Sequence, residues 1–308
     1  MKATVFAPGS VGNVGPGFDV LGLAVGGLGD TVTVELSDES RVIVRGRDAE
    51  LIPTDPAKNA ASIAANAMLR KCRTGFSPSR PRGPRDGLKP VLHCIVTLDK
   101  GLPMSGGIGG SAASSVAGAY AAALACGVTP SHDDVILAAL EGEEFVSGRH
   151  LDNIAPITLG GLVLSRSIEP LDVIKLPTPP WSVVLARPNA RVETKKARAI
   201  LPKQWDLWPQ QMANTAALIH AFATADGALA RRALEDLYAE PRRAALIPRF
   251  DDIKRAALDA GAFGCSISGS GPTIFALTDD PEKCAAAMNI GDCEVRIAEI
   301  DHQGARPV

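Results

Sequence analysis

The sequence predicts an α+β protein built from two lobes. With 308 residues the chain exceeds the usual size of one domain, and 46% of its residues are apolar, which is enough for packed cores. Segments with strand patterns and helix patterns are mixed along the chain without strict β–α alternation. A Pro-rich stretch at 176–180 divides them, so we expect an N-terminal lobe over residues 1–175 and a C-terminal lobe over residues 176–308.

The N-terminal half alternates short strands with helices. Apolar and polar residues alternate in 31–36 and again in 41–44, which is typical of half-buried strands separated by a turn. Alanine is the best helix former and makes up eight of the fourteen residues in 112–125, so a helix is predicted there. The other elements predicted in this half are helices at 59–70 and 133–145 (N-cap Ser131) and a strand at 91–98.

The C-terminal half contains the same two kinds of segment in irregular order, which favours an α+β lobe. Its predicted strands lie at 182–186, 273–277 and 294–300. Its predicted helices lie at 210–224, 229–239, 250–260 and from residue 281 onward.

Composition argues against several classes of function. A net charge of −2 disfavours a nucleic-acid-binding protein, and aromatic residues, at 4%, are too few to suggest base-stacking platforms. Six scattered cysteines without a C-x-x-C pair indicate the reduced thiols of a cytosolic protein. The longest apolar run, 116–128, is shorter than the roughly 18 residues of a membrane span, and no signal-peptide pattern opens the chain. We therefore expect a cytoplasmic protein that binds neither nucleic acid nor membrane.

Residues 71–90 form a basic, Pro- and Gly-rich stretch with six basic residues and one acidic residue. This composition predicts a solvated surface loop. A basic surface that binds an acidic partner is the alternative.

A glycine-rich segment, GLPMSGGIGGSAASS at 101–115, lies between a predicted strand and the alanine-rich helix. Glycines let the backbone approach a ligand closely, and the start of the helix offers unpaired N–H groups and the positive end of the helix dipole. The segment therefore predicts an anion cradle, most naturally for phosphates. Ser111 can add a hydroxyl contact to a phosphate oxygen or to Mg²⁺.

Other interpretations of this segment remain. A Walker A loop needs a lysine, and none occurs from 101 to 128. The residues at 107–112 match G-x-G-x-x-A, the dinucleotide fingerprint, but 129–134 resembles a helix cap and not the second strand that the fingerprint requires. A glycine-rich turn that only packs a helix against a strand is the structural alternative.

Two further glycine-rich segments carry polar residues. In 7–23, Asn13 and Asp19 are expected in a loop that suits ligand binding better than a hairpin, where they can hold an ammonium or a hydroxyl group. The same residues also stabilise ordinary turns. The glycine- and serine-rich segment 261–277 is either a tight turn or a backbone wall that faces phosphate or substrate; it lacks the G-x-S-x-G elbow of the α/β-hydrolases.

A third segment, 141–161, combines acids with a histidine. His150, Asp152 and Asn153 follow a predicted helix that carries several glutamates. A carboxylate at the end of that helix can reach Mg²⁺, which prefers oxygen ligands. The candidate glutamates are Glu141, Glu143 and Glu144.

The order of these motifs resembles that in the galactokinase–homoserine kinase–mevalonate kinase–phosphomevalonate kinase (GHMP) superfamily. The resemblance rests on PGSVGNVGPGFDVLGL at 8–23, P-x-x-x-G-I-G-G-S-A-A at 103–113 and ISGSGPTIFAL at 267–277. It extends over nearly the whole chain. The segments that resemble the homoserine kinase branch are HLDNIAPITLGGLVL (150–164), VETKKARAILP (192–202) and AEPRRAALIPRF (239–250).

This resemblance implies an N-terminal lobe like domain 2 of ribosomal protein S5 and a C-terminal ferredoxin-like lobe. It implies ATP and Mg²⁺ as cofactors, transfer of the γ-phosphate to L-homoserine and a homodimer. A related kinase for another small alcohol, such as mevalonate or a sugar, is the alternative within this class. A nucleotide- or amino-acid-binding module without catalysis is the alternative outside it.

The resemblance also implies roles for individual residues. Substrate contacts fall to Asn13, Asp19, His150, Asn153, Thr194, Arg198 and Arg243. ATP contacts fall to Pro103, Ser105, Gly106, Gly107, Gly109, Gly110, Ser111, Ala112 and, near the adenine, Asn59. Ser111 and Glu143 match the Mg²⁺-binding pair. Asn153 is expected to orient the reacting hydroxyl beside His150, and Asp152 is the candidate if a base acts.

The chain departs from the family pattern at two places. Gly110 replaces the first of two serines in the phosphate loop, which should remove a hydroxyl contact but leave the cradle, since Ser111 remains. The stretch from Glu143 to His150 is one residue short, so Glu144 competes with Glu143 for the metal role.

Overall fold

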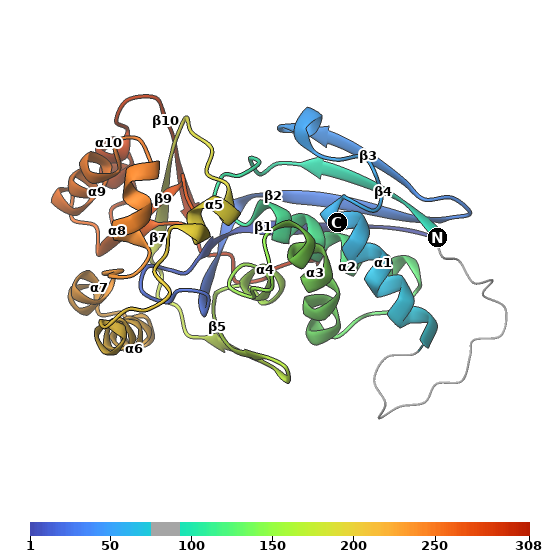
Figure 1. Cartoon of the computed structure of the whole chain (residues 1–308), viewed down its shortest axis with the longest axis horizontal. Coiled ribbons are helices and arrows are strands. Elements are labelled where there is room, and N and C mark those ends of the chain that lie inside the picture. The colour runs from blue at the N-terminus through green and yellow to red at the C-terminus, as the bar shows by residue number, and fades with distance from the viewer. Residues whose placement is uncertain (75–92) are drawn as a thin grey trace.

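The structure is a computed structural model that describes residues 1–74 and 93–308. It contains two β-sheets flanked by helices (Figure 1). In the first sheet the strand order is β11 (Arg306–Pro307), β1 (Lys2–Gly12), β2 (Leu21–Ser37), β4 (His93–Lys100) and β3 (Arg41–Gly46). Two further strands extend it: β5 (Leu162–Ile168) pairs with β2, and β6 (Leu171–Leu176) pairs with β5. The second sheet orders its strands as β10 (Cys293–Glu299), β7 (Ser182–Pro188), β9 (Ile274–Thr278) and β8 (Gly264–Ile267). Mixed helix and sheet confirm the predicted α+β class.

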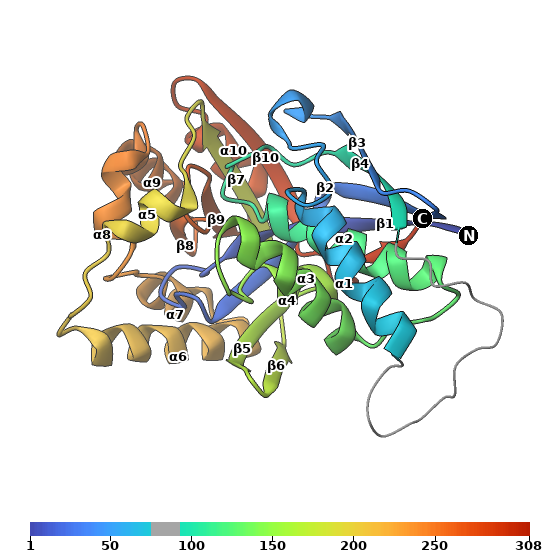
Figure 2. The same cartoon turned by 45° about the vertical axis from the view of Figure 1, so that its right-hand side comes forward.

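Helices pack against the first sheet (Figures 1 and 2). Small side chains let them approach closely. The helices are α1 (Ala60–Thr74), α2 (Gly110–Ala125), α3 (His132–Val146) and α4 (Ile154–Leu159). Helix α2 lies on β1 and β2 with α1 and α3 packed against it, and 12 of its 16 residues are buried. A Cβ at Gly118 would lie 2.4 Å from the carbonyl oxygen of Ala61 on α1, so only glycine permits this contact.

Strand β7 separates the two cores of the second sheet. Val183 and Leu185 face a core shared with α6 (Trp208–Thr224), α7 (Gly227–Ala233) and the start of β2. Val184 and Ala186 face the opposite core, which contains α9 (Phe250–Asp259) and α10 (Pro281–Met288). This alternation follows from the two-residue period of a strand, and the first core joins the two sheets. The remaining short helices are α5 (Thr194–Ala199), α8 (Glu240–Arg243) and the 3₁₀ turns at Ala49–Leu51 and Ala244–Leu246.

Most predicted elements are present, with shifted ends. The predicted helix at 112–125 is α2, and Ser131 caps α3 by accepting a hydrogen bond from the Asp134 N–H at 3.2 Å. The predicted strand at 31–36 is the last part of β2, which begins at Leu21. The division into lobes at 175/176 stays a prediction.

Three predictions about the extent of a segment are wrong, and the first two concern 7–23 and 229–239. The loop expected over 7–23 is confined to residues 13–20, because β1 and β2 form a hairpin in which Gly12 faces Gly22. The glycines there serve close packing: a Cβ at Gly22 would lie 1.7 Å from the carbonyl oxygen of Asp152. The helix expected over 229–239 stops at Ala233, because the Asp236 carboxylate accepts the N–H groups of residues 238–240 at 2.8–3.0 Å.

The basic stretch 71–90 is described only in part. Residues 71–74 belong to α1 and not to a loop, since the helix continues to Thr74. Residues 75–90 lie outside the described part of the chain, so the loop prediction for them stays a prediction. Among the helices of residues 1–74 and 93–308, none is both long enough and apolar enough to cross a bilayer.

Candidate active site

A cleft of about 490 Å³ brings together segments from both halves of the chain. Its walls come from the β1–β2 turn, the glycine-rich segment after β4, the end of α3, and α5 and α8. In Figures 1 and 2, α5 lies between α8 on one side and α3 and α4 on the other. The predicted site residues that line the cleft are Asn13, Asp19, Asn59, Pro103, Ser105, Gly106, Gly107, Gly109, Gly110, Ser111, Glu143, His150, Asp152, Asn153, Thr194, Arg198 and Arg243.

The glycine-rich segment forms a turn between β4 and α2 and is held in place by hydrogen bonds from residues of the C-terminal half of the chain. Ser105 and Gly107 have φ values of 51° and 78°. The Gly106 carbonyl accepts a hydrogen bond from Thr273 Oγ1, and the Gly107 carbonyl accepts one from Ser268 Oγ, both at 2.6 Å. Gly109 caps α2 in the left-handed conformation without a side-chain hydrogen bond. The amides at the start of α2 therefore have no capping side chain and can bind an anion.

A buried ion pair that the sequence did not reveal supports this segment. The Lys100 ammonium donates to Asp30 Oδ2, to the Gly110 carbonyl at 2.7 Å and to Ser114 Oγ at 3.2 Å. Asp30 is fully buried, and its other oxygen accepts the N–H groups of residues 101 and 102. The Lys100–Asp30 ion pair therefore hydrogen-bonds to the backbone at the start of the glycine-rich segment (residues 101 and 102) and near its end (Gly110). Lys100 also lines the cleft.

The acidic side chain placed for a metal is Glu143. It is 6% exposed, its Oε1 accepts from Ser147 Oγ, and its Oε2 is buried with no hydrogen-bond partner in the described residues. Burial raises the pKa of Glu143, while the hydroxyls of Ser147 and Ser111 and the charge of Lys100 oppose that rise. Glu144 points to the surface and pairs with Arg149 at 3.4 Å. Of the two competing glutamates, Glu143 therefore faces the cleft.

Asp19 and Arg198 form a two-point ion pair in the cleft. The guanidinium donates to the two carboxylate oxygens at 2.7 and 2.9 Å, and His150 Nδ1 lies 3.8 Å from Asp19 Oδ1. Asp19 and Asn13 both have positive φ, 62° and 67°. The Asn13 amide holds this turn, because its oxygen accepts the Asp19 N–H at 2.9 Å and its Nδ2 donates to the Gly269 carbonyl at 3.1 Å. The turn role and the cleft position of Asn13 therefore coincide.

Arg243 is a second guanidinium in the same region, and Phe18 lies against both. Arg243 is 2% exposed and donates to the carbonyls of Ala197 at 3.2 Å and Gly269 at 2.9 Å. Burial, and then the charge of Arg198, lower the pKa of Arg243. The guanidinium carbons of Arg198 and Arg243 lie 5.2 and 5.4 Å from the Phe18 ring centroid. Phe18 was not predicted as a site residue, although it directly precedes Asp19.

His150, Asp152 and Asn153 enter the cleft from the turn before α4. Burial lowers the pKa of His150, which favours the neutral imidazole, and its Nε2 has no partner in the described part of the protein. Burial, together with the negative charges of Asp19 and Glu143, raises the pKa of Asp152 to about 7. Asn153 Oδ1 accepts from Ser10 Oγ at 2.8 Å, so a β1 serine that was not predicted fixes this amide.

Three predicted residues have side chains that contact other parts of the protein, although two of them, Asn59 and Thr194, line the cleft. Ala112 does not line the cleft, because its methyl group is fully buried in the core of the first sheet. Asn59 lines the cleft, but its Nδ2 donates to the Pro53 carbonyl at 2.9 Å and its Oδ1 accepts the Ser62 N–H at 3.2 Å. Thr194 Oγ1 lies 3.3 Å from Ser270 Oγ.

Comparisons with known proteins agree with this fold. The model of the GHMP kinases N terminal domain matches residues 60–161, and the model of the GHMP kinases C terminal domain matches residues 218–291. The chain therefore belongs to the GHMP kinases. These matches include the glycine-rich segment, Glu143, Asn153 and Arg243.

Individual relatives show to which family within the GHMP kinases the chain belongs. A homoserine kinase of Chloroherpeton thalassium is 42% identical over 292 residues, which cover 92% of this chain and 88% of the relative. A homoserine kinase of Arabidopsis thaliana is 42% identical over an alignment of 332 residues that covers 100% of this chain and 85% of the relative. The crystal structure of a homoserine kinase from Cytophaga hutchinsonii is 40% identical, has a TM-score of 0.85 and covers 100% of this chain and 97% of its own. The chain belongs to the homoserine kinase family.

Proposed function

We propose that the protein transfers the γ-phosphate of ATP to the hydroxyl of L-homoserine, giving ADP and O-phospho-L-homoserine. One observation carries the choice of substrate: Asp19, Arg198 and Arg243 lie together in the cleft that also contains the glycine-rich segment. Family membership supports the choice of reaction. ATP is the phosphate donor of this family.

An amino-acid substrate suits these charges. Arginine forks bind carboxylates at two points, so Arg198 and Arg243 can hold the α-carboxylate, while Asp19 can accept hydrogen bonds from the ammonium. Asp19 and Arg198 pair with each other in the structure. A zwitterion brings a charge of opposite sign to each partner, so neither is left uncompensated. Mevalonate has a carboxylate but no ammonium, and it would place a second anion beside Asp19.

The phosphates of ATP are expected at the glycine-rich segment and the uncapped start of α2. Phosphoryl transfer depends mainly on positioning and on neutralising charge on the phosphate oxygens. Ser111 and Glu143 would hold Mg²⁺, which when bound neutralises part of that charge. The buried Glu143 Oε2, which has no hydrogen-bond partner in residues 1–74 and 93–308, fits this role. In these residues no group of three His, Cys, Asp or Glu side chains could hold a metal, so the phosphates would supply further ligands.

The homoserine hydroxyl is expected beside Asn153, whose amide would orient it, and no strong base is required. A carboxyl group with a pKa near neutrality can act as a general base, so Asp152 is the rival for this step. Asp152→Asn separates the two views. Retained turnover agrees with orientation by Asn153, whereas loss of turnover with intact folding and homoserine binding would establish Asp152 as the base.

An assay of ADP release with L-homoserine, L-threonine, mevalonate and galactose tests the substrate. We expect turnover with L-homoserine, and Asp19→Asn should raise its KM far more than the KM for ATP. Faster turnover of mevalonate or galactose would favour a related kinase. Nucleotide binding without transfer to any alcohol would favour a binding module without catalysis.

Further expectations accompany this proposal. They are a homodimer, a cytoplasmic location, and lobes like domain 2 of ribosomal protein S5 (residues 1–175) and the ferredoxin-like fold (residues 176–308). Size-exclusion chromatography with light scattering tests the first of these.

A further inference from the structure

Asp48 adopts an unusual conformation outside the cleft. It follows β3 with φ 54° and ψ 25°, in the left-handed region that residues other than glycine seldom occupy. It precedes the 3₁₀ turn Ala49–Leu51, where an aspartate commonly caps the first N–H groups, yet its side chain makes no cap hydrogen bond there. Its carboxylate is turned away from its own helix and toward other segments.

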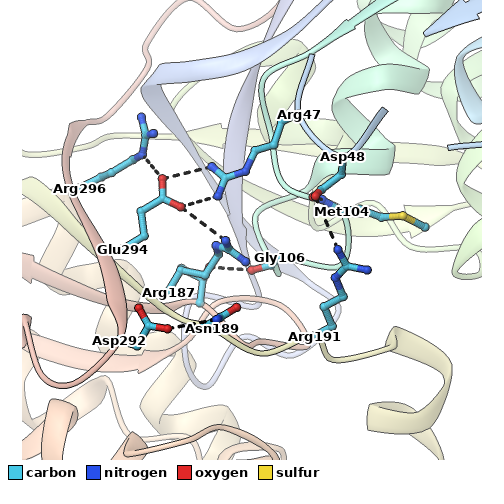
Figure 3. Close-up of polar contacts among 11 residues, drawn as sticks. Arg47, Asp48, Met104, Gly106, Arg187, Asn189, Arg191, Asp292, Glu294 and Arg296 are labelled. Atoms are coloured by element: carbon cyan, nitrogen blue, oxygen red, sulfur yellow. Dashed lines mark hydrogen bonds and ion pairs between the residues drawn. The ribbon is translucent and has the colours of Figure 1, made fainter. Parts of the chain in front are cut away.

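The two oxygens of Asp48 contact two different segments (Figure 3), each of which contributes residues to the lining of the cleft. Oδ2 accepts the Met104 N–H at 2.9 Å, in the glycine-rich segment directly before Ser105. Oδ1 lies 3.6 Å from Arg191 Nη2, three residues before α5, the helix that carries Thr194 and Arg198. One carboxylate thus joins the segment expected to bind nucleotide to the segment expected to bind the amino acid.

The residue before Asp48 is firmly anchored. The Arg47 N–H donates to the Lys100 carbonyl at 2.8 Å, and its guanidinium donates to the Glu294 carboxylate at 2.5 and 3.1 Å. Arg187 and Arg296 contact the same carboxylate at 3.5 and 2.8 Å (Figure 3). The hydrogen bonds from Arg47 are the main reason that the pKa of Glu294 falls to about 2. This cluster joins the end of β3 to β7 and β10, so Asp48 projects from a fixed point between the two sheets.

We propose that Asp48 is a positioning residue that couples nucleotide binding to amino-acid binding, an inference that rests on the proposed function. Nucleotide bound against the glycine-rich segment restrains the Met104 amide and, through it, the Asp48 carboxylate. The fixed carboxylate holds Arg191, which restrains the segment leading to Arg198. Coupling of this kind is reciprocal, so the amino acid tightens nucleotide binding by the same factor.

Isothermal titration calorimetry measures this coupling directly. The Kd of a non-hydrolysable ATP analogue is determined alone and with saturating L-homoserine, and the ratio of the two values is the coupling factor. Asp48→Asn keeps an acceptor oxygen for the Met104 amide and tolerates the left-handed conformation, but it removes the charge that faces Arg191. Arg191→Gln removes the other charge of the pair. Arg166→Gln is the matched control, because Arg166 pairs with Asp172 on the β5–β6 hairpin and loses the same charge.

We expect a coupling factor above one in the wild type. It should fall about threefold in Asp48→Asn and in Arg191→Gln, and no further in the double variant, because both changes remove one surface pair of modest strength. Arg166→Gln should keep the wild-type factor. A factor of one in the wild type, or an unchanged factor in both variants, overturns the proposal. If Asp48→Asn does not fold, Arg191→Gln decides alone, since the Arg191 side chain is 57% exposed.

Turnover of L-homoserine by the wild type is measured first. Its absence refutes the proposed function and this inference together. Its presence with unchanged coupling in the variants refutes only the role of Asp48.

Discussion

Replacing Asp152 with asparagine removes a buried carboxyl group while keeping its shape. Asp152 is 4% exposed and lies near the carboxylates of Asp19 and Glu143. Both its burial and those charges disfavour its ionised form, which is why the pKa of Asp152 rises from 3.8 to about 7. In the unfolded chain the same carboxyl is hydrated and ionises at its ordinary pKa.

The sign of the effect on stability follows from proton binding. Between pH 3.8 and about 7 the folded state holds a proton on Asp152 that the unfolded state has lost, so the free energy of unfolding falls as the pH rises. Above about pH 7 the loss is complete and amounts to about 4 kcal/mol, at about 1.4 kcal/mol per tenfold change in proton affinity. Asparagine does not ionise, so Asp152→Asn should be more stable than the wild type by about this amount near pH 8.

Urea unfolding followed by tryptophan fluorescence measures the difference. The advantage of Asp152→Asn should grow by about 3 kcal/mol between about pH 5 and about pH 8, since roughly two pH units of that interval lie below the folded pKa. An advantage that is independent of pH, or a variant less stable than the wild type near pH 8, would refute the argument that Asp152 is buried as an acid of raised pKa.

Three further variants test other parts of the cleft. Glu143→Gln should raise the Mg²⁺ concentration for half-maximal turnover by about tenfold or more, because loss of even an outer-shell partner has an effect of this size. Glu144→Gln is the control and should leave that concentration unchanged. Equal effects of the two substitutions would contradict the assignment of the metal to Glu143. Lys100→Met should lower the free energy of unfolding by about 3–5 kcal/mol in urea titrations, because it leaves the buried Asp30 charge uncompensated. Wild-type stability in that variant would contradict the structural role of the pair. Arg243→Lys should raise the KM for L-homoserine by about 10–100-fold through loss of charge-assisted hydrogen bonds, with little change in the KM for ATP. Arg232→Lys, at an exposed position, is the control for Arg243→Lys. A similar rise in the KM for L-homoserine in Arg232→Lys would count against a specific contact between Arg243 and the carboxylate.

Local sequence predicts the regular elements of this fold well and the irregular ones poorly. The alanine content of α2 and the alternation at 31–36 in β2 act through neighbouring residues, so they are visible in the sequence. Strand β1 was missed because its glycines and proline resemble a loop. Its Gly12 instead leaves room for distant side chains, since a Cβ there would lie 2.6 Å from Asp152 Oδ2 and 2.8 Å from Asn153 Nδ2. The predicted helix at 229–239 extended too far toward the C-terminus. Only the folded chain shows that the Asp236 carboxylate accepts hydrogen bonds from the N–H groups of residues 238–240.

Motif order predicted which residues meet in the cleft, but it did not predict what holds them there. The residues to which the family resemblance assigned roles all line it except Ala112. Of the candidate glutamates, Glu143 lines it and Glu141 and Glu144 do not. Lys100, Phe18 and Ser10 were missed, because each acts through a partner far away in the sequence: Asp30, Arg243 and Asn153. A lysine that ends a strand gives no sign in the sequence that it is buried. The Asn59 amide lines the cleft and hydrogen-bonds to the Pro53 carbonyl and the Ser62 N–H, so its place near the adenine stays a prediction.

The peptide of Gly269 explains how the cleft is assembled from distant segments. Its N–H donates to the Gly12 carbonyl at 3.0 Å, and its carbonyl accepts from Asn13 Nδ2 at 3.1 Å and Arg243 Nη1 at 2.9 Å. The neighbouring Ser268 holds the Gly107 carbonyl. The turn between β8 and β9 thus fixes both the side chains expected to bind the amino acid and the backbone expected to bind nucleotide. Since these contacts exist within the protein alone, the site is largely preorganised, and binding energy need not be spent on bringing the two walls together.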